Sequence, residues 1–269
     1  MGRHLTLRRA NNLPGEVRMS LTARGVTIHF GGLVAVDGMD LDAIPPEIIG
    51  LIGPNGAGKT TFLNCLSGIY RPTNGSVLWN GEELVGQAPH VLLARGIART
   101  FQNITSLHDL SVLDVVKLGS NMRGDVDFAD RLRNLFRSEK ALDEELTEMF
   151  LKPLRLADVA HQPIQTLSYG HRKAVDLARA LAAHPLLLLL DEPVAGLTSQ
   201  EGMAMAAVIR TVRDHFGCAV VMVEHKMDVV MDTCERIVVM AAGAKIFAGS
   251  PSEVQSSAEV RRVYLGEPS

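Results

Sequence analysis

Short apolar stretches separated by polar turns fill the first third of the chain. Residues 20–30 and 36–42 have the composition of half-buried strands, and residues 48–52 form an uninterrupted apolar run of strand length. Residues 77–85 carry an Asn-Gly pair between two short strand-like segments, which is the pattern of a two-residue β-hairpin. We therefore predict a strand-rich N-terminal portion.

From Gly50 onward, strands begin to alternate with helices. Residues 186–190, 219–223 and 237–240 repeat the apolar composition of a buried strand, and amphipathic segments separate them. This alternation predicts βαβ units built around a parallel sheet.

Between residues 103 and 165 the strand signals disappear. Apolar residues recur at helical spacing from 141 to 150, beside acidic ones, and predict an inserted helical subdomain. The charge-rich stretch 123–148 mixes both signs, so it favours a solvated helix face over a binding patch. Residues 250–253, Ser-Pro-Ser-Glu, have the spacing of a capping box and predict a C-terminal helix.

Composition and charge narrow the class of protein. With 269 residues, and roughly 150 residues in a typical domain, the chain is one large domain or a core with a smaller subdomain. Charged residues make up 21% and hydrophobic ones 46%, which excludes a disordered or collagen-like chain. The net charge of -3 comes without a dominant basic block, so no nucleic-acid partner is expected.

Cysteine usage and hydropathy favour a cytosolic protein that does not cross a membrane. Cys65, Cys218 and Cys234 have no C-x-x-C spacing and lie in apolar surroundings, so we expect reduced thiols. The longest apolar runs fall far short of the roughly 20 residues that cross a bilayer. Residues 1–19 hold no apolar run of signal-peptide length and are interpreted as a flexible tail, with an arginine contact to a membrane as the alternative.

A glycine-rich loop lies between the apolar run 48–52 and a helical run that begins at Thr61. It matches the phosphate-binding pattern G-x-x-x-x-G-K-[ST] without a mismatch. Its members are Gly53, Pro54, Asn55, Gly56, Ala57, Gly58, Lys59 and Thr60. Glycines let backbone N–H groups close around phosphate oxygens, and the helix N-terminus adds the positive end of its dipole. We expect Lys59 to reach the β and γ phosphates of a nucleotide and the hydroxyl of Thr60 to bind Mg²⁺.

Two adjacent carboxylates, Asp191 and Glu192, follow the apolar run 186–190. The carboxyl ends of parallel strands form the edge at which open α/β sheets bind ligands. Asp191 is the expected Mg²⁺ partner, directly or through water, and Glu192 is placed to polarise a water in line with the γ-phosphate. Such a pair alone is often only a helix-capping feature, and the phosphate loop favours the catalytic interpretation.

A segment just ahead of that run narrows the choice among nucleotidases. Residues 167–171, Leu-Ser-Tyr-Gly-His, open an amphipathic helix and resemble the LSGGQ signature of the ATP-binding cassette (ABC) family. The resemblance covers the chain from about Ser20 to Glu267.

Further segments resemble the remaining motifs of this family, in the expected order. Phe30 stands where the family has an aromatic residue that stacks on adenine. Residues 99–102, Arg-Thr-Phe-Gln, resemble the Q-loop, whose glutamine, here Gln102, senses Mg²⁺ and the attacking water. Residues 195–198 occupy the position of the D-loop. An isolated histidine at a strand end is usually structural, but the place of His225 after a core strand matches the switch histidine.

The resemblance implies an α/β fold, a P-loop NTPase core with a mixed sheet, an antiparallel β subdomain and an inserted α-helical subdomain. The core would span residues 20–102 and 166–248, and the helical insert residues 103–165. A C-terminal helix and tail would span residues 249–269.

The resemblance also implies a reaction, in which ATP is bound with Mg²⁺ and hydrolysed. The residues implied for catalysis are Lys59, Gln102, Glu192 and His225, and those implied for the metal are Thr60, Gln102 and Asp191. Those implied for nucleotide binding are Phe30, the loop residues 53–60, Thr61, Ser168 and Gly170. Ser168 and Gly170, at a helix start, would hold the γ-phosphate of ATP bound by a second cassette. Two chains would therefore pair head to tail with two nucleotides between them.

A transport role follows from the same resemblance. A single cassette without its own span resembles an importer ATPase, and residues 31–36, 96–102 and 264–267 resemble the branched-chain amino acid uptake group, which includes urea and amide carriers. The expected partners are a second ATPase subunit of the same or homologous sequence, two membrane permeases and, indirectly, an extracytoplasmic solute-binding protein. A permease would press a short helix into a groove near Gln102. The chain would lie at the cytoplasmic face of the plasma membrane.

Four residues depart from the family pattern. Tyr169 and His171 replace a glycine and the glutamine of the signature, Thr198 replaces the D-loop aspartate, and Pro46 takes a turn position that is often glycine. The catalytic residues are retained, so we expect a competent hydrolase. Two alternatives stay open: a regulatory cassette that hydrolyses poorly, and a soluble ABC ATPase of translation or DNA repair. The latter usually carries two cassettes or a long coiled-coil insertion.

Overall fold

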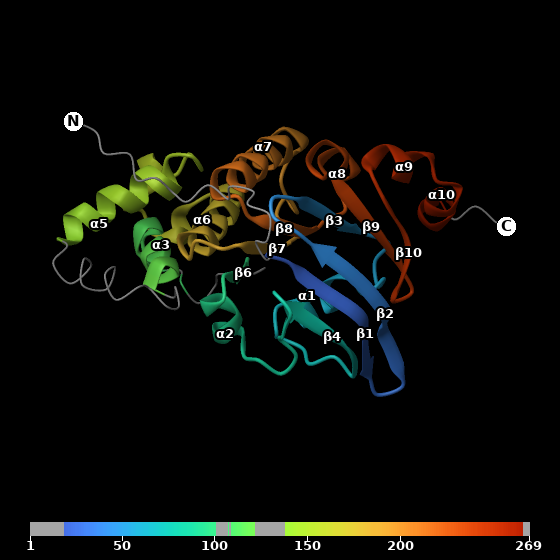
Figure 1. Cartoon of the computed structure of the whole chain (residues 1–269). Coiled ribbons are helices and arrows are strands. Elements are labelled where there is room, and N and C mark those ends of the chain that lie inside the picture. Colours follow the sequence, from blue (N-terminus) through green and yellow to red (C-terminus); the bar gives the residue numbers. More distant parts are fainter. Residues whose placement is uncertain (1–18, 101–106, 108, 122–137, 266–269) are drawn as a thin grey trace, which may run out of the picture.

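Two β-sheets flanked by helices make up the protein (Figure 1). The computed structural model describes residues 19–100, 107, 109–121 and 138–265. Gln102 and nearly all of the predicted tail lie outside the described residues.

The central sheet has six strands in the order β10-β9-β3-β8-β7-β6. They are β3 (Ile48–Ile52), β6 (Ile97–Arg99), β7 (Leu187–Asp191), β8 (Ala219–Val223), β9 (Arg236–Ala241) and β10 (Ala244–Gly249). Neighbours from β9 to β6 run parallel, whereas β10 runs antiparallel to β9. The predicted parallel sheet is confirmed, and its antiparallel edge strand makes it mixed. Every residue of β3, β7 and β8 is buried, which explains their uninterrupted apolar sequences.

The second sheet has four antiparallel strands in the order β2-β1-β4-β5. They are β1 (Leu21–Phe30), β2 (Leu33–Ala43), β4 (Asn74–Trp79) and β5 (Glu82–Glu83). The predicted hairpin is confirmed, because Asn80 and Gly81 both have positive φ, at 52° and 84°. Its second strand is shorter than predicted, since the carboxylate of Glu83 accepts hydrogen bonds from the next two backbone N–H groups.

Helices surround the sheets on several sides, and α1 packs between the two sheets. The helices are α1 (Lys59–Leu66), α2 (Pro89–Ala94), α3 (Val112–Asn121), α5 (Glu139–Leu146), α6 (Tyr169–Ala182), α7 (Ser199–Phe216), α8 (Met227–Thr233), α9 (Pro251–Ser256) and α10 (Ala258–Leu265). A π-helical turn, Thr147–Leu151, continues α5, and short 3₁₀ turns lie at Ala157–Val159 and Ile164–Thr166. The predicted capping box is confirmed, with Ser250 and Glu253 bonded to each other's backbone N–H groups at the start of α9.

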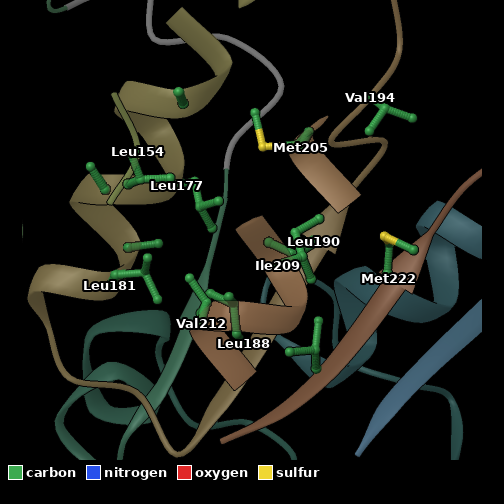
Figure 2. Packing of buried hydrophobic residues seen from close by; sticks show 14 of the residues in the cluster. Leu154, Leu177, Leu181, Leu188, Leu190, Val194, Met205, Ile209, Val212 and Met222 are labelled. Atoms are coloured by element: carbon green, nitrogen blue, oxygen red, sulfur yellow. The ribbon is translucent and has the colours of Figure 1, made fainter. Parts of the chain in front are cut away.

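Strand β7 divides the core into two parts. Leu188 and Leu190 pack with Leu181 of α6 and Ile209 of α7 on one face (Figure 2). The alternate leucines of β7 join the opposite cluster, which includes α1 and the antiparallel sheet. The strand is therefore buried on both faces, and Asp191 is its last residue.

Helices are the main elements among the described residues of the segment 103–165, as predicted, although an isolated β-bridge joins Ser111 to Pro163. Its helix α3 packs against α6, and the two backbones approach so closely that a Cβ on Gly119 would lie 2.0 Å from the carbonyl oxygen of Arg179. The division of the chain into core and helical insert at residues 102 and 166 stays a prediction.

No helix among the described residues is both long and apolar enough to cross a membrane. Within the same residues, no group of three or more His, Cys, Asp or Glu side chains is placed to hold a metal ion. The three cysteines are buried and unpaired, as predicted, and burial raises the pKa of Cys218 and Cys234 to about 12.

Candidate functional site

The glycine-rich loop joins β3 to α1 and closes tightly against the rest of the core. Gly53 and Gly58 have φ values of 154° and 92°. A Cβ on Gly53 would lie 2.1 Å from the carbonyl oxygen of Met240, and one on Gly58 would lie 2.2 Å from that of Ala35. These two positions therefore require glycine for space, and Gly58 also for its backbone conformation.

Lys59 is the first residue of α1, and its side chain turns back over the loop. The residue is 5% exposed, and Nζ donates hydrogen bonds to the carbonyl oxygens of Gly53 and Pro54, both at 2.8 Å. Burial lowers the pKa of the ammonium group, whereas Glu192 and Asp191 raise it. The Lys59 ammonium is thus partly removed from solvent, and both of its hydrogen-bond acceptors are uncharged carbonyl groups.

Asp191 ends β7 and lies beside the start of α1. Its Oδ1 is 3.4 Å from the hydroxyl of Thr60, and its Oδ2 accepts a hydrogen bond of 2.9 Å from Nη2 of Arg99. The carboxylate is buried, and the guanidinium of Arg99 is the ion-pair partner that a buried acidic group requires. The structure therefore brings together Thr60 and Asp191, the two described residues predicted to bind Mg²⁺.

Arg99, at the end of β6, is a site residue to which the sequence analysis gave no role of its own. Its Nη1 donates to Oδ1 of Asn64 at 2.6 Å and to the hydroxyl of Ser67 at 2.7 Å, both at the end of α1. Burial lowers the pKa of the guanidinium, and the contact with Asp191 raises it. The available signal was an arginine directly after the apolar residues Ile97 and Ala98, because a buried charge requires a partner.

Glu192 and His225 lie at the ends of neighbouring strands β7 and β8. Nε2 of His225 is 2.9 Å from Oε1 of Glu192, and both side chains are partly exposed. Glu192 has a positive φ of 50°, and its backbone N–H donates to the carbonyl oxygen of Val223. The carbonyl oxygen of Glu192 accepts a hydrogen bond from Nζ of Lys173. The backbone is thus held in a conformation that non-glycine residues seldom adopt, as is common at functional sites.

Glu224, the residue directly after β8, is a second residue that the sequence analysis missed. It is 1% exposed, and its carboxylate accepts hydrogen bonds from the backbone N–H groups of Val194 and His225 at 2.8 and 2.9 Å. It therefore fixes the segments that follow β7 and β8, and its role is structural.

Ser168 caps the N-terminus of α6, where its hydroxyl accepts a hydrogen bond of 3.2 Å from the N–H of His171. Tyr169 packs on the predicted D-loop, since a Cβ on Gly196 would lie 2.8 Å from the tyrosine ring. Among the described residues, no hydrogen bond links Ser168 to the glycine-rich loop of the same chain. The structure thus does not join the two predicted phosphate contacts within one chain.

Phe30 ends β1 with 46% of its surface exposed, and its ring meets that of Tyr70 edge to face at a centroid distance of 5.4 Å.

Thr198 caps α7 in a full capping box with Glu201. The backbone N–H of Thr198, and to a lesser extent its hydroxyl, donate to the Glu201 carboxylate and lower its pKa. Thr198 thus fulfils the helix-capping role that an aspartate at this position would also fulfil. Gln102 lies outside the described residues.

Comparison with known proteins places the chain among ATP-binding subunits. The family model described as ABC transporter matches residues 36–195. The high-affinity branched-chain amino acid transport ATP-binding protein BraF of Pseudomonas aeruginosa is 34% identical over 252 residues, which cover 93% of this chain and 99% of that protein. LivG of Escherichia coli, named for the same transport, is 34% identical over 92% of this chain and 98% of its own. A solved ATP-binding cassette of an ABC transporter in its ADP conformation matches with a TM-score of 0.80 and 27% identity, over 93% of this chain and 99% of that one.

Proposed function

This chain belongs to the ABC transporter family, and we propose that it is the subunit that binds and hydrolyses ATP to power an importer. The solutes would be branched-chain amino acids or related small polar molecules, passing through separate permease subunits. The observation that carries the proposal is the arrangement of Asp191 beside Thr60 and of Glu192 beside His225 at one edge of the sheet. The names of BraF and LivG support the class of solute.

The glycine-rich loop is the proposed seat of the triphosphate. A backbone loop with no room for side chains at Gly53 and Gly58 fits phosphate oxygens that approach N–H groups closely. Phosphate oxygens would replace the two carbonyl groups as acceptors for Lys59, and charge-assisted hydrogen bonds to an anion are about twice as strong as neutral ones. The exposed ring of Phe30 would stack on the adenine.

The donor set formed by Thr60 and Asp191 suits Mg²⁺, which prefers hydroxyl and carboxylate oxygens. Gln102, which follows β6 in the sequence, would complete the set. Bound Mg²⁺ would neutralise charge that develops on the β and γ phosphate oxygens.

Glu192 is the proposed general base. Its carboxylate would accept a proton from the water that attacks the γ-phosphate, and a positioned base of this kind contributes about 10² to 10⁴-fold in rate. With its ring proton on Nε2, His225 would donate a hydrogen bond to Oε1 of Glu192. The other carboxylate oxygen would then be left for the water. His225 would thus orient the base.

A second cassette of the same or homologous sequence would complete each site. The start of α6 offers free backbone N–H groups and a serine hydroxyl, which is a suitable seat for an anion. Ser168 and Gly170 would contact the γ-phosphate held by the partner's loop, so that ATP is clamped between two chains. Hydrolysis would let the pair open.

We propose that the permease binds at a pocket of about 390 Å³, which lies between strand β6 and the helices α2, α3 and α6. Its walls come from the segment after α1 and from α2, β6, α3 and α6, and most of its lining is apolar. A short permease helix in this pocket would transmit opening and closing of the pair to the membrane. The chain would therefore work at the cytoplasmic face of the plasma membrane, and a solute-binding protein would select the solute on the other side.

The direct test is reconstitution of the chain in vesicles with the permeases and second cassette encoded beside it. We expect ATP-dependent uptake of labelled leucine, isoleucine or valine, and phosphate release that rises when the permeases are present. Phosphate release that no permease stimulates would contradict a transport role. Slow release even in the full complex would favour the regulatory alternative, which His171 and Thr198 motivate.

A further inference from the structure

Arg99 lies between the pocket proposed for the permease and the proposed Mg²⁺ site at Asp191. Its side chain is 10% exposed and lines the pocket of about 390 Å³, while its guanidinium pairs with Asp191 at the nucleotide edge of the sheet. Among the described residues that line the pocket, Arg99 and Arg179 alone carry a permanent charge, and most of the others are apolar. One side chain therefore takes part in both the pocket and the proposed Mg²⁺ site.

The guanidinium joins two elements that carry the proposed metal ligands. Nη2 holds Oδ2 of Asp191 at the end of β7, and Nη1 holds Asn64 and Ser67 at the end of α1. Because Oδ2 is taken, Oδ1 is the oxygen left on the side of Thr60. The planar fork of arginine sets the orientation of the carboxylate as well as its charge, which the single ammonium of lysine does not.

One N–H donor of the Arg99 side chain is left without an acceptor among the described residues. Nε of Arg99 is buried and has no hydrogen-bond partner among the described residues. A buried unsatisfied donor is costly, so a movement of the guanidinium that brings Nε to an acceptor is favourable. Such a movement changes the hydrogen bond from Nη2 to Asp191, because Nε and Nη2 belong to one planar guanidinium group.

We propose that Arg99 is a positioning residue, which presents Oδ1 of Asp191 to Mg²⁺ and couples the state of the pocket to that carboxylate. The inference rests on the proposed function, since it takes Mg²⁺ with ATP to bind at Asp191. Coupling between two sites is reciprocal, so Mg²⁺ with ATP must also change the environment of the pocket.

The first measurement is the gain in ATP affinity that Mg²⁺ gives, from titrations of the full chain with ATP in EDTA and in Mg²⁺. We expect Arg99→Lys to leave the affinity in EDTA within about twofold and to reduce the gain from Mg²⁺ by about tenfold, the usual range for losing a group that orients a metal ligand. Ser67→Ala, which removes one anchor of Nη1, lowers the gain in the same direction by less. This smaller change keeps the test open if Arg99→Lys folds poorly.

Arg236→Lys is the matched control. Arg236 forms a two-armed pair with Glu47, at 2.8 and 2.9 Å, outside the site. We expect this variant to lose thermal stability without any change in the gain from Mg²⁺.

The second measurement is a spectroscopic signal from the pocket. His90 is exposed and lines the pocket, and the native cysteines are buried, so His90→Cys accepts a single environment-sensitive fluorophore. ATP with Mg²⁺ should shift the emission of this probe, and Arg99→Lys should abolish the shift. If Arg99→Lys keeps both the full gain in ATP affinity from Mg²⁺ and the emission shift of the probe, the inference is overturned. A wild-type chain that binds no ATP with or without Mg²⁺ overturns the proposed function, and this inference with it.

Discussion

Nε2 of His225 lies 2.9 Å from Oε1 of Glu192, although 33 positions of sequence separate the two residues. The parallel pairing of β7 with β8 creates this contact, because each residue follows its strand at the same edge of the sheet. The pair is partly exposed, so a water can reach the carboxylate.

The first prediction concerns His225→Ala. Removing the imidazole leaves Glu192 free to turn away from the water, so we expect kcat to fall by about 10²-fold, the lower end of the range for general-base catalysis. ATP affinity should stay within about twofold, because no contact of the phosphate loop is lost. Phosphate release and nucleotide binding measure the two effects. His161→Ala, at an exposed histidine of the helical portion, is the control and should change neither.

The second prediction concerns Gly58→Ala. A Cβ there would lie 2.2 Å from the carbonyl oxygen of Ala35, at a φ of 92°. The loop must therefore shift, and we expect at least a tenfold loss of ATP affinity together with a lower Tm.

Gly86→Ala provides the comparison for that variant. Gly86 has a similar φ of 84° but nothing within 4 Å of its added Cβ. It should cost only the backbone strain of about 1 kcal/mol and leave ATP affinity unchanged. Equal ATP affinities of the two variants would show that the close approach at Gly58 is not what shapes the loop.

The third prediction concerns the helix cap at Thr198. Thr198→Ala should lower the free energy of unfolding by about 1 kcal/mol, whereas Thr198→Asp should keep it, because aspartate also caps helices. Urea unfolding of both variants measures this difference. A Thr198→Asp variant as unstable as Thr198→Ala would mean that the cap geometry does not accept a carboxylate.

The same cap predicts a pH dependence. The hydrogen bonds from Thr198 hold the pKa of the Glu201 carboxyl below its ordinary value. A lowered folded-state pKa gives stability that is present above the unfolded pKa of about 4.3 and is lost as pH falls through the folded value. Thr198→Ala keeps the backbone N–H bond, the larger cause, and removes only the bond from the hydroxyl. The stability difference between wild type and Thr198→Ala should therefore shrink only slightly below pH of about 4, and a difference that grows there would contradict the cap.

Much of the fold could be predicted from the sequence, because its strands are buried on both faces. The apolar runs at β3, β7 and β8 have the length of strands rather than helices, and the phosphate loop between β3 and α1 has a pattern of its own. The hairpin turn was predictable for the same local reason.

Contacts between distant segments could not be predicted. Arg99 and Asp191 are 92 positions apart, and only the parallel pairing of β6 with β7 brings them together. The edge-to-face pair of Phe30 and Tyr70 joins a strand end to the segment after α1. A charged residue in an apolar strand predicts that a partner exists, but not which residue it is.

The account depends most on Glu192 as the base that activates water for ATP hydrolysis, and Glu192→Gln tests this directly. The amide keeps the size of the side chain and its contact with His225 but cannot accept the proton. We expect ATP affinity within about twofold of wild type, and single-turnover phosphate release slower by about 10² to 10⁴-fold. Phosphate release at a near-normal rate from a variant that binds ATP would contradict the assignment.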